Sequence, residues 1–262
     1  MNDSQVSTAS KAVPILTYHS LDDSGAITSV APRDFDEQMR ILAERGFSGV
    51  GLSTLIDFWD GRGSVPPKPV VITFDDGFAN ILEHAAPCLS ELNFQATIFV
   101  VSGRCGQTND WQEQSDAPRL PLLSWAQLGE IAAAGFEIGA HSMTHRVLTK
   151  IRLSEAVSEI VDSKTAIEDR LGRPAQTFAY PFGLFDSAHY DTVRKHFRAA
   201  CGTKLRNAKP GQDRHRLPRL DVYYFRKPRL FRIFETPVGD AYLTLRAAAR
   251  GLHRNVFRRD GD

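Results

Sequence analysis

Short apolar runs alternate with amphipathic stretches along most of the chain. Runs rich in β-branched and aromatic residues are typical of buried strands, and they occur at VPILTYH, VVITF, QATIFVVS, FEIGAHS, AQTFAYPFG, RAACGT and RLDVYY. Stretches with apolar residues three and four positions apart are typical of helices, and they occupy 32–47, 79–92, 124–135, 154–172 and 186–197. Repeated strand–helix units predict a parallel sheet with crossover helices, and their number favours a barrel over a small open sheet.

Local signals refine these elements. Ser124 is the expected N-cap of the third helix, and Gly135 marks its end. Pro87 lies inside the second helix, where it either starts a second turn or kinks the first. The polar stretches 61–69 and 105–121 are expected to be loops.

The same pattern divides the chain into three parts. Residues 1–12 are small and polar and predict a flexible tail, whereas 13–224 hold the strand–helix units. The remaining part, 225–262, has nine Lys/Arg against four Asp/Glu and is expected to be helical. Its arginines recur every fourth residue, at Arg246, Arg250, Arg254 and Arg258.

A possible apolar face lies near this basic stripe, formed by Tyr242, Leu245, Ala249, Leu252 and Val256. The combination is typical of a helix that lies on an anionic membrane surface. A solvated face of an ordinary terminal helix explains the same pattern.

Composition narrows the class of protein. The chain has 262 residues, 42% hydrophobic and 24% charged, which are values of a globular protein. A formal net charge of +1 gives no reason to expect nucleic acid as a partner. The three cysteines are widely spaced without a CxxC motif, which argues against a disulfide framework and against a thiolate metal site.

The N-terminal residues lack a basic stretch followed by an apolar one, and no run of about 18 apolar residues occurs anywhere. We therefore expect a cytoplasmic protein, with a peripheral position at the inner face of the membrane if the basic segment binds lipid.

Two adjacent carboxylates, Asp75 and Asp76, follow the apolar run VVITF. Like charges in contact repel each other, and burial increases the cost. A cation or a shared proton should therefore lie beside them. A structural turn that caps the next helix would explain one aspartate more easily than two.

Two histidines, His141 and His145, follow the run FEIGA. Their spacing places both side chains on one side of a helical turn, about 5–6 Å apart at Cβ. Such a pair alone can also sit on a surface or cap a turn. With one carboxylate it supplies three N/O ligands and leaves a position for water, as in a catalytic zinc site, or an iron or cobalt site with more ligands. The other carboxylate is then free to accept a proton.

These motifs resemble those of the NodB-type polysaccharide deacetylases, carbohydrate esterase family 4. The matching segments are TFDDG at 73–77, HSMTH at 141–145 and FAYPFG at 178–183, so the core motifs lie beyond about residue 68. The resemblance implies a distorted (β/α) barrel of about seven strands.

The resemblance also implies a role for each motif residue. Asp75 corresponds to the general base, and the backbone N–H of Phe182 to a donor to the oxyanion. The implied metal ligands are Asp76, His141 and His145. Zinc is the metal expected first, with Co²⁺, Ni²⁺ or Fe²⁺ as alternatives.

The chain departs from the common family pattern at three places, one of which is Phe182, where the family has a tyrosine. Ala179 occupies the position of an arginine that orients the base, and no Leu-x-His segment supplies the late acid. The opening ILTYHSL resembles a rearranged subgroup of exopolysaccharide deacetylases, in which an N-terminal Tyr-His strand supplies that acid. This makes His19 the candidate acid, with His215 as its competitor. Arg219 can replace the missing arginine by pairing with the base, although it can equally be an ordinary surface arginine.

The expected function is metal-dependent removal of acetyl groups from N-acetylated sugars of a polysaccharide or lipid-linked glycan, in exopolysaccharide biosynthesis. Three alternatives stay open: O-acetyl ester hydrolysis on the same fold, metal-independent hydrolysis of C–N bonds in small cyclic or ureido compounds, and an inactive sugar-binding module.

Overall fold

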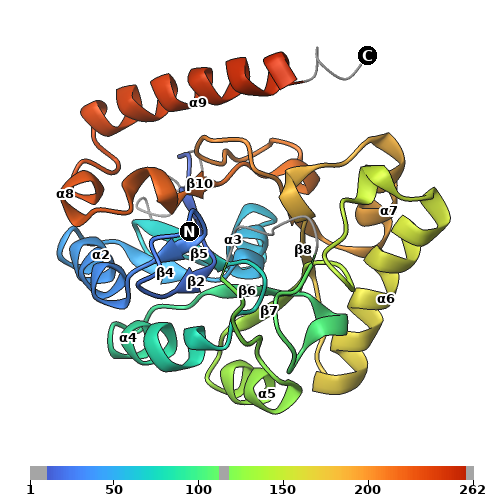
Figure 1. The fold of residues 1–262 in the computed structure, drawn as a ribbon. Helices are drawn as coiled ribbons and strands as arrows, with labels where there is room; N and C mark the ends of the chain where they lie inside the picture. The colour runs from blue at the N-terminus through green and yellow to red at the C-terminus, as the bar shows by residue number, and fades with distance from the viewer. Residues whose placement is uncertain (1–10, 112–117, 258–262) are drawn as a thin grey trace.

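The structure, a computed structural model, describes residues 11–111 and 118–257, with side chains as far as residue 249. Its strands are β1 (Ile15–Tyr18), β2 (Ser20–Leu21), β3 (Ser29–Val30), β4 (Ser48–Val50), β5 (Pro69–Phe74), β6 (Thr97–Val100), β7 (Glu137–Ala140), β8 (Thr177–Ala179), β9 (Ala199–Cys201) and β10 (Leu220–Asp221). The main sheet is parallel, in the order β10-β1-β5-β6-β7-β8-β9, and β4 pairs with the first half of β5 (Figure 1).

The sheet curls back on itself, which confirms the predicted barrel. Leu217 forms a parallel bridge with Cys201 of β9, and Leu220, three residues later, pairs with Leu16 of β1. The residues that lead into β10 therefore link the two ends of the sheet. This link is short and irregular, so the barrel is distorted, as the family resemblance implied.

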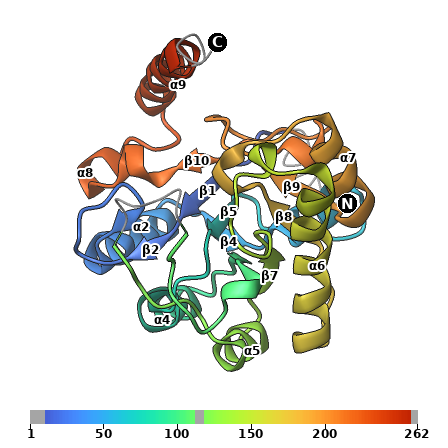
Figure 2. The same cartoon turned by 45° about the vertical axis from the view of Figure 1, so that its right-hand side comes forward.

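Helices cover the outside of the curled sheet (Figure 2). The α-helices are α2 (Pro32–Glu44), α3 (Leu52–Trp59), α4 (Ala86–Glu91), α5 (Trp125–Ala133), α6 (Leu153–Leu171), α7 (Ser187–His196), α8 (Pro228–Phe231) and α9 (Pro237–Phe257), of which α9 projects away from the sheet (Figure 2). Ser124 caps α5 through a capping box, as predicted. Pro87 lies in the first turn of α4, directly after a π-helix at Ile81–Ala85. Of the two alternatives for Pro87, the structure therefore shows the one in which it starts a second turn.

Six of the seven expected strands are shorter than predicted, and two of them end in tight turns. The run 175–183 is a strand only over Thr177–Ala179, because Phe182 and Gly183 have φ values of 58° and 66° and turn the chain. Similarly, the run 219–224 leaves the sheet after Asp221 and continues as a 3₁₀ turn.

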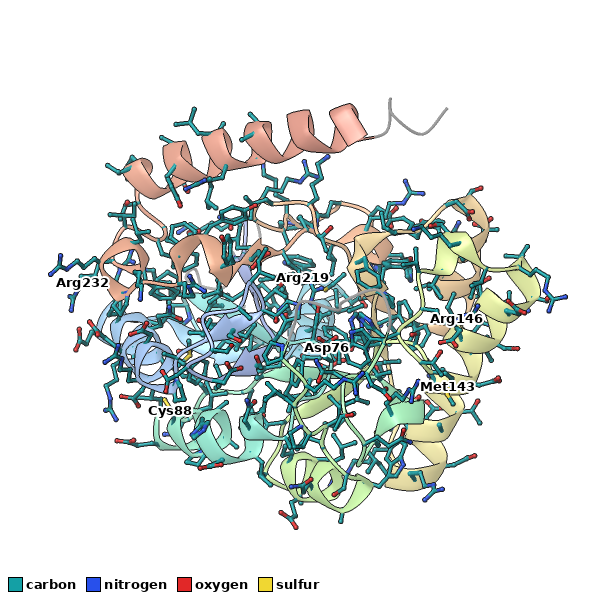
Figure 3. The ribbon with its side chains drawn as sticks, viewed as in Figure 1. Asp76, Cys88, Met143, Arg146, Arg219 and Arg232 are labelled. Atoms are coloured by element: carbon teal, nitrogen blue, oxygen red, sulfur yellow. The ribbon has the colours of Figure 1, made fainter. Side chains whose placement is uncertain are left out.

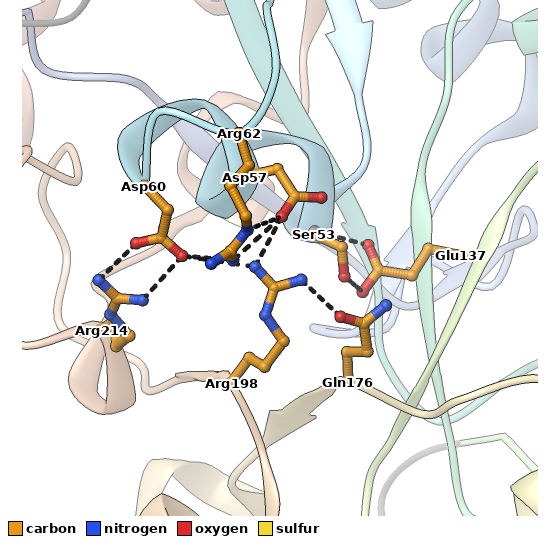
Figure 4. Close-up of polar contacts among 8 residues, drawn as sticks. All are labelled: Ser53, Asp57, Asp60, Arg62, Glu137, Gln176, Arg198 and Arg214. Atoms are coloured by element: carbon orange, nitrogen blue, oxygen red, sulfur yellow. Dashed lines mark hydrogen bonds and ion pairs between the residues drawn. The ribbon is translucent and has the colours of Figure 1, made fainter.

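The sequence pattern gave no prediction for β4 and α3. Strand β4 has only three residues, too few to show an alternation, and Gly49 lies in it because a Cβ there would come 2.7 Å from Cβ of Phe94. Helix α3 starts without a side-chain cap of its own. Glu137 of β7 takes over this task by accepting hydrogen bonds from the backbone N–H and hydroxyl of Ser53 (Figure 4).

A network of ion pairs surrounds α3 on the same side (Figure 4). Asp57 and Asp60 accept hydrogen bonds from Arg198 of the segment before β9, and Asp60 also accepts them from Arg214. These contacts tie α3 to the far end of the sheet. They lie away from the carboxyl ends of the strands and so belong to the fold rather than to the site below.

The C-terminal segment begins inside the core and ends outside it. Phe225, Phe231 and Phe234 are fully buried, and the Tyr242 hydroxyl donates a hydrogen bond to the carbonyl of Tyr224. Helix α9 then runs across the outer side of the molecule (Figure 1). A domain boundary near residue 224 stays a prediction.

Part of the predicted basic and apolar pattern lies beyond the described residues. The side chains of Arg250, Leu252, Arg254 and Val256, all of Arg258, and most of the 1–12 tail are outside them. Within the described part, Leu245 is 71% exposed. None of the described helices is both long enough and apolar enough to span a bilayer.

Candidate active site

One cavity of about 300 Å³ is lined by every residue for which the sequence predicted a catalytic or metal-binding role, except the competing acid His215. It opens at the carboxyl ends of the parallel strands, where the loops after β1, β5, β7 and β8 meet. Such edges are the usual location of active sites in barrels of this kind. The predicted residues that line it are His19, Asp75, Asp76, His141, His145, Phe182 and Arg219.

Asp76 and the two histidines form a compact group of potential metal ligands. Oδ1 of Asp76 lies 3.5 Å from Nε2 of His141 and 3.3 Å from Nε2 of His145. One ligand atom from each residue falls within 4.8 Å of the others, and all three side chains are buried. Neither Asp76 oxygen has a hydrogen-bond partner among the described residues. A buried carboxylate without partners is costly, and a divalent cation would supply the missing interaction.

The backbone gives the two aspartates different partners. Asp76 has a φ of 70°, in the left-handed region, and the chain turns sharply after the end of β5. Figure 3 shows Asp76 and Arg219 near the centre of the molecule, where the strand ends gather. Asp76 faces the histidines, while Asp75 faces Arg219.

The segment His141–His145 is not a helical turn, contrary to the prediction from its spacing. Ser142 and His145 have φ values of 65° and 61°, which no right-handed helix contains. The ring centroids are nevertheless 5.0 Å apart, because the backbone bends between the two histidines and brings the second ring back toward the first. The hydroxyl of Ser142 accepts a hydrogen bond from the N–H of His145 and closes this bend.

Glu159 of α6 holds this loop, and the sequence analysis did not identify it. Its carboxylate accepts hydrogen bonds from the N–H of Thr144, at 2.8 Å, and from the Thr144 hydroxyl, at 2.5 Å. Its backbone carbonyl also accepts a hydrogen bond from the N–H of Met143. The signal that could have found it is a glutamate on the inner face of the long helix, where an apolar residue is expected.

Hydrogen bonding fixes the tautomer of His141. Its Nδ1 lies 2.8 Å from the carbonyl oxygen of Ala179. Since a carbonyl can only accept, Nδ1 carries a hydrogen, and in the neutral ring Nε2, which faces Asp76, has the free lone pair. A hydrogen bond from the other ring nitrogen to a carbonyl is the usual second contact of a metal-binding histidine. Burial lowers the pKa of His141, but the carboxylates of Asp75 and Asp76 outweigh this and raise it above the usual value.

His145 is held between aromatic rings. Its ring centroid lies 4.4 Å from that of Trp111 and 4.7 Å from that of Phe182. Burial lowers the pKa of His145 to about 3, so the ring is neutral at physiological pH and can offer a lone pair.

Asp75 and Arg219 form a buried, bidentate ion pair. Arg219 donates from Nη1 to Oδ1 of Asp75 at 2.6 Å and from Nη2 to Oδ2 at 2.7 Å. Its Nε donates to the carbonyl of Gly202, which fixes the plane of the guanidinium. Burial would raise the pKa of Asp75, but the charge of Arg219 outweighs it and holds that pKa well below the usual range. Asp75 is therefore ionised and oriented.

The structure separates the two candidate acids. His19 follows β1, is half-buried and lines the cavity. His215 lies in a 3₁₀ turn near the other end of β9, where its Nε2 is 3.0 Å from the carbonyl oxygen of Phe197. His215 does not line the cavity.

Comparison with known families agrees with this geometry. The sequence profile described as polysaccharide deacetylase matches residues 62–199, more than half of the chain. The chain belongs to the polysaccharide deacetylase family. The matched segment contains Asp75, Asp76, His141, His145 and Phe182, whereas His19 and Arg219 lie outside it.

Relatives agree with the exopolysaccharide-type subgroup. The Bacillus subtilis protein YxkH is 28% identical over 185 residues, which cover 70% of this chain and 61% of that protein. A poly-β-1,6-N-acetyl-D-glucosamine N-deacetylase of Staphylococcus aureus is 26% identical, over 64% of this chain and 58% of that enzyme. This chain thus matches about three fifths of the length of these relatives.

A solved structure confirms the fold. A polysaccharide deacetylase from Bacillus cereus superimposes with a TM-score of 0.70 at 26% identity, covering 85% of this chain and 68% of that one.

Proposed function

We propose that this protein is a metal-dependent hydrolase that removes acetyl groups from N-acetylated sugars of a polysaccharide or lipid-linked glycan. The observation that carries the proposal is the pairing of two different carboxylates in one cavity. Asp76 lies against two buried histidines, while the adjacent Asp75 is ionised and held by Arg219. A ligand set and a separate base are what amide hydrolysis by a metal-bound water requires.

The proposed metal ligands are Asp76, His141 and His145. A divalent cation bound there, zinc first and Co²⁺, Ni²⁺ or Fe²⁺ as alternatives, would polarise the acetyl carbonyl and acidify the attacking water. The free oxygens of Asp76 and the neutral His145 ring support this assignment.

The chain's own groups would carry the protons. Asp75 accepts a proton from the attacking water, whose oxygen bonds to the acetyl carbonyl carbon. The N–H of Phe182 donates to the oxyanion that forms. His19 protonates the nitrogen as the C–N bond breaks, because a neutral amine leaves more readily than an amide anion. The products are acetate and the free amino sugar.

The C-terminal segment supports a second, finer proposal, contact with an anionic membrane surface. This segment exposes three apolar side chains: Leu230 is 39% exposed, Val238 65% and Leu245 71%. Arg229, next to Leu230, and Arg246, next to Leu245, are also exposed. Exposed apolar side chains mixed with arginines suit an interface between water and anionic lipid headgroups. A cytoplasmic location at the inner face of the membrane stays part of this proposal.

The test of the main proposal compares two variants on acetate release and metal content. His141→Ala should lose both the metal, by elemental analysis, and the activity. Asp75→Asn should keep the metal and lose activity by about 10²-fold or more, the usual scale for a general base. N-acetylglucosamine oligomers, peptidoglycan fragments and acetylxylan serve as substrates. Full metal occupancy in His141→Ala would overturn the ligand assignment, and release from acetylxylan alone would favour O-acetyl ester hydrolysis.

A further inference from the structure

We propose that a basic pocket beside the active-site cavity binds an anionic group, a carboxylate or a phosphate, carried by the acetylated glycan. The proposal rests on the proposed function and specifies its substrate. The basic pocket has a volume of about 370 Å³ and is lined by Phe185, Thr203, Lys204, Arg206, Asp213 and Arg216.

The basic pocket adjoins the active-site cavity. Thr203 lines both, and Gly183, at the edge of the basic pocket, directly follows Phe182 of the cavity. The backbone at Gly183 lies close to the side chain of Thr203, since a Cβ on Gly183 would be 2.2 Å from Oγ1 of Thr203. Both hollows open at the carboxyl ends of β8 and β9. A glycan whose acetylated unit occupies the cavity therefore has its neighbouring group at the basic pocket.

The charges of the basic pocket are not balanced within the protein. Oδ2 of Asp213 lies 3.5 Å from Nε of Arg216, and Oδ1 of Asp213 accepts a hydrogen bond from the backbone N–H of His215. Lys204 and Arg206 form no ion pair within residues 11–111 and 118–249. Their two positive charges face the pocket without a carboxylate of their own. Concave sites lined by one sign of charge concentrate ligands of the opposite sign.

The active-site cavity offers no comparable pair of free cationic side chains. Arg219 lines it but is paired with Asp75, and Asp76 and Asp221 line it as well. Among the residues that line the two hollows, the lysine and arginine side chains without a carboxylate partner, Lys204 and Arg206, therefore lie beyond Thr203. Phe185, whose ring stacks on Tyr180 at a centroid distance of 4.0 Å, gives the basic pocket an apolar wall next to its cations. An apolar wall with convergent charged groups suits a sugar ring that bears a carboxylate or phosphate.

Binding measurements test this inference without requiring turnover. Calorimetry on the intact chain would make two comparisons. The first sets a hyaluronan tetrasaccharide, which carries carboxylates, against a neutral chitin tetrasaccharide. The second sets N-acetylglucosamine phosphate against N-acetylglucosamine. We expect the anionic ligands to bind about tenfold more tightly than their neutral counterparts, and the preference to shrink as salt rises. The two anionic ligands separate a uronate from a sugar phosphate as the preferred group.

The double variant combines Lys204→Gln with Arg206→Gln. Both side chains are exposed, so we expect the fold and the affinity for the neutral ligand to stay unchanged. The double variant should abolish the preference, and for the preferred anionic substrate it should raise KM about tenfold with little change in kcat. Lys150→Gln removes one exposed charge from a turn that lines neither hollow and should leave the preference unchanged. An anionic preference that survives the double variant, or that is absent from the wild type, overturns the proposal. If the protein prefers anionic ligands but releases no acetate, the basic pocket is supported as an anion site and the proposed activity is rejected.

Discussion

At the scale of single residues, Asp75 and Asp76 differ in what they contact although they are neighbours in the chain. Asp75 accepts two hydrogen bonds from Arg219, whereas the Asp76 carboxylate lies against the rings of His141 and His145. The repulsion between the adjacent charges is thus relieved separately on each side. One carboxylate is paired within the protein, and the other is left available for a cation.

Replacing Arg219 tests how much the fold depends on this pairing. Arg219→Met would leave Asp75 buried without a counter-charge, and the free energy of unfolding should fall by about 3–5 kcal/mol in urea titration. Adding Asp75→Asn to Arg219→Met removes the isolated charge and should restore part of that loss. If the double variant is no more stable than Arg219→Met, the charge of Asp75 is not what Arg219 compensates.

The acid can be identified by comparing two histidines. His19→Ala should lower the rate of N-acetyl hydrolysis by roughly 10²-fold with metal retained, because His19 lines the cavity. His215→Ala should be nearly silent, because His215 lies elsewhere. The loss in His19→Ala should be smaller on an activated acetyl ester, whose leaving group needs less protonation. If His215→Ala loses activity and His19→Ala hydrolyses the amide at the wild-type rate, His215 is the acid and His19 is not.

At the scale of elements, the loop between β7 and α6 carries two of the proposed metal ligands in a conformation that local preference does not favour. Residues other than glycine with a positive φ are uncommon, and this loop contains two, Ser142 and His145. The contacts from Glu159 to Met143 and Thr144 hold it in place from the adjacent helix. Glu159 is thus a positioning residue for the histidines.

Glu159→Gln tests this role, since the amide nitrogen cannot accept the second hydrogen bond from Thr144. We expect metal affinity to fall by about 10- to 100-fold, the range seen when the groups that support ligands are changed. Competition with a chelator would measure it, and the melting temperature should change little. Glu155→Gln makes the same change one turn earlier on α6 and should leave the affinity intact. Equal affinities in both variants would mean that the loop keeps its shape without Glu159.

At the scale of the whole molecule, the C-terminal segment combines a buried anchor with an exposed end. Phe231 and Phe234 fix it to the body, while Val238 and Leu245 face outward. An exposed apolar side chain gains free energy on entering a lipid interface, and nearby arginines gain it from anionic headgroups.

Cosedimentation with vesicles tests this surface on the full chain. Binding to vesicles with anionic lipid should exceed binding to zwitterionic ones and should weaken with salt. Val238→Glu with Leu245→Glu should reduce the affinity by about tenfold or more, since it removes apolar contact and adds repulsion. Leu153→Glu is a matched control, because Leu153 is 51% exposed on α6. Equal binding to both lipid types would reject the electrostatic part of the proposal.

The sequence by itself determined those features of the protein that depend on residues close to one another in the chain. Apolar runs and helical spacing predicted most strands and helices, and the order of motifs predicted the metal ligands and the base. The strand and helix predictions succeed because these patterns are local. The residues predicted as ligands and base lie together because the parallel strands bring their carboxyl ends to one edge, and their roles stay predictions.

Only the tertiary structure decided contacts between residues far apart in sequence. Arg219 and Asp75 are 144 residues apart, so spacing cannot show that their side chains meet in two hydrogen bonds. The bend at His141–His145 likewise depends on Glu159 of another element, which overrides the helical spacing of the histidines. The basic pocket is a further case, because it forms only where the turn after β8 meets the loop after β9. Such contacts depend on how the barrel closes, and closure is a property of the packed molecule.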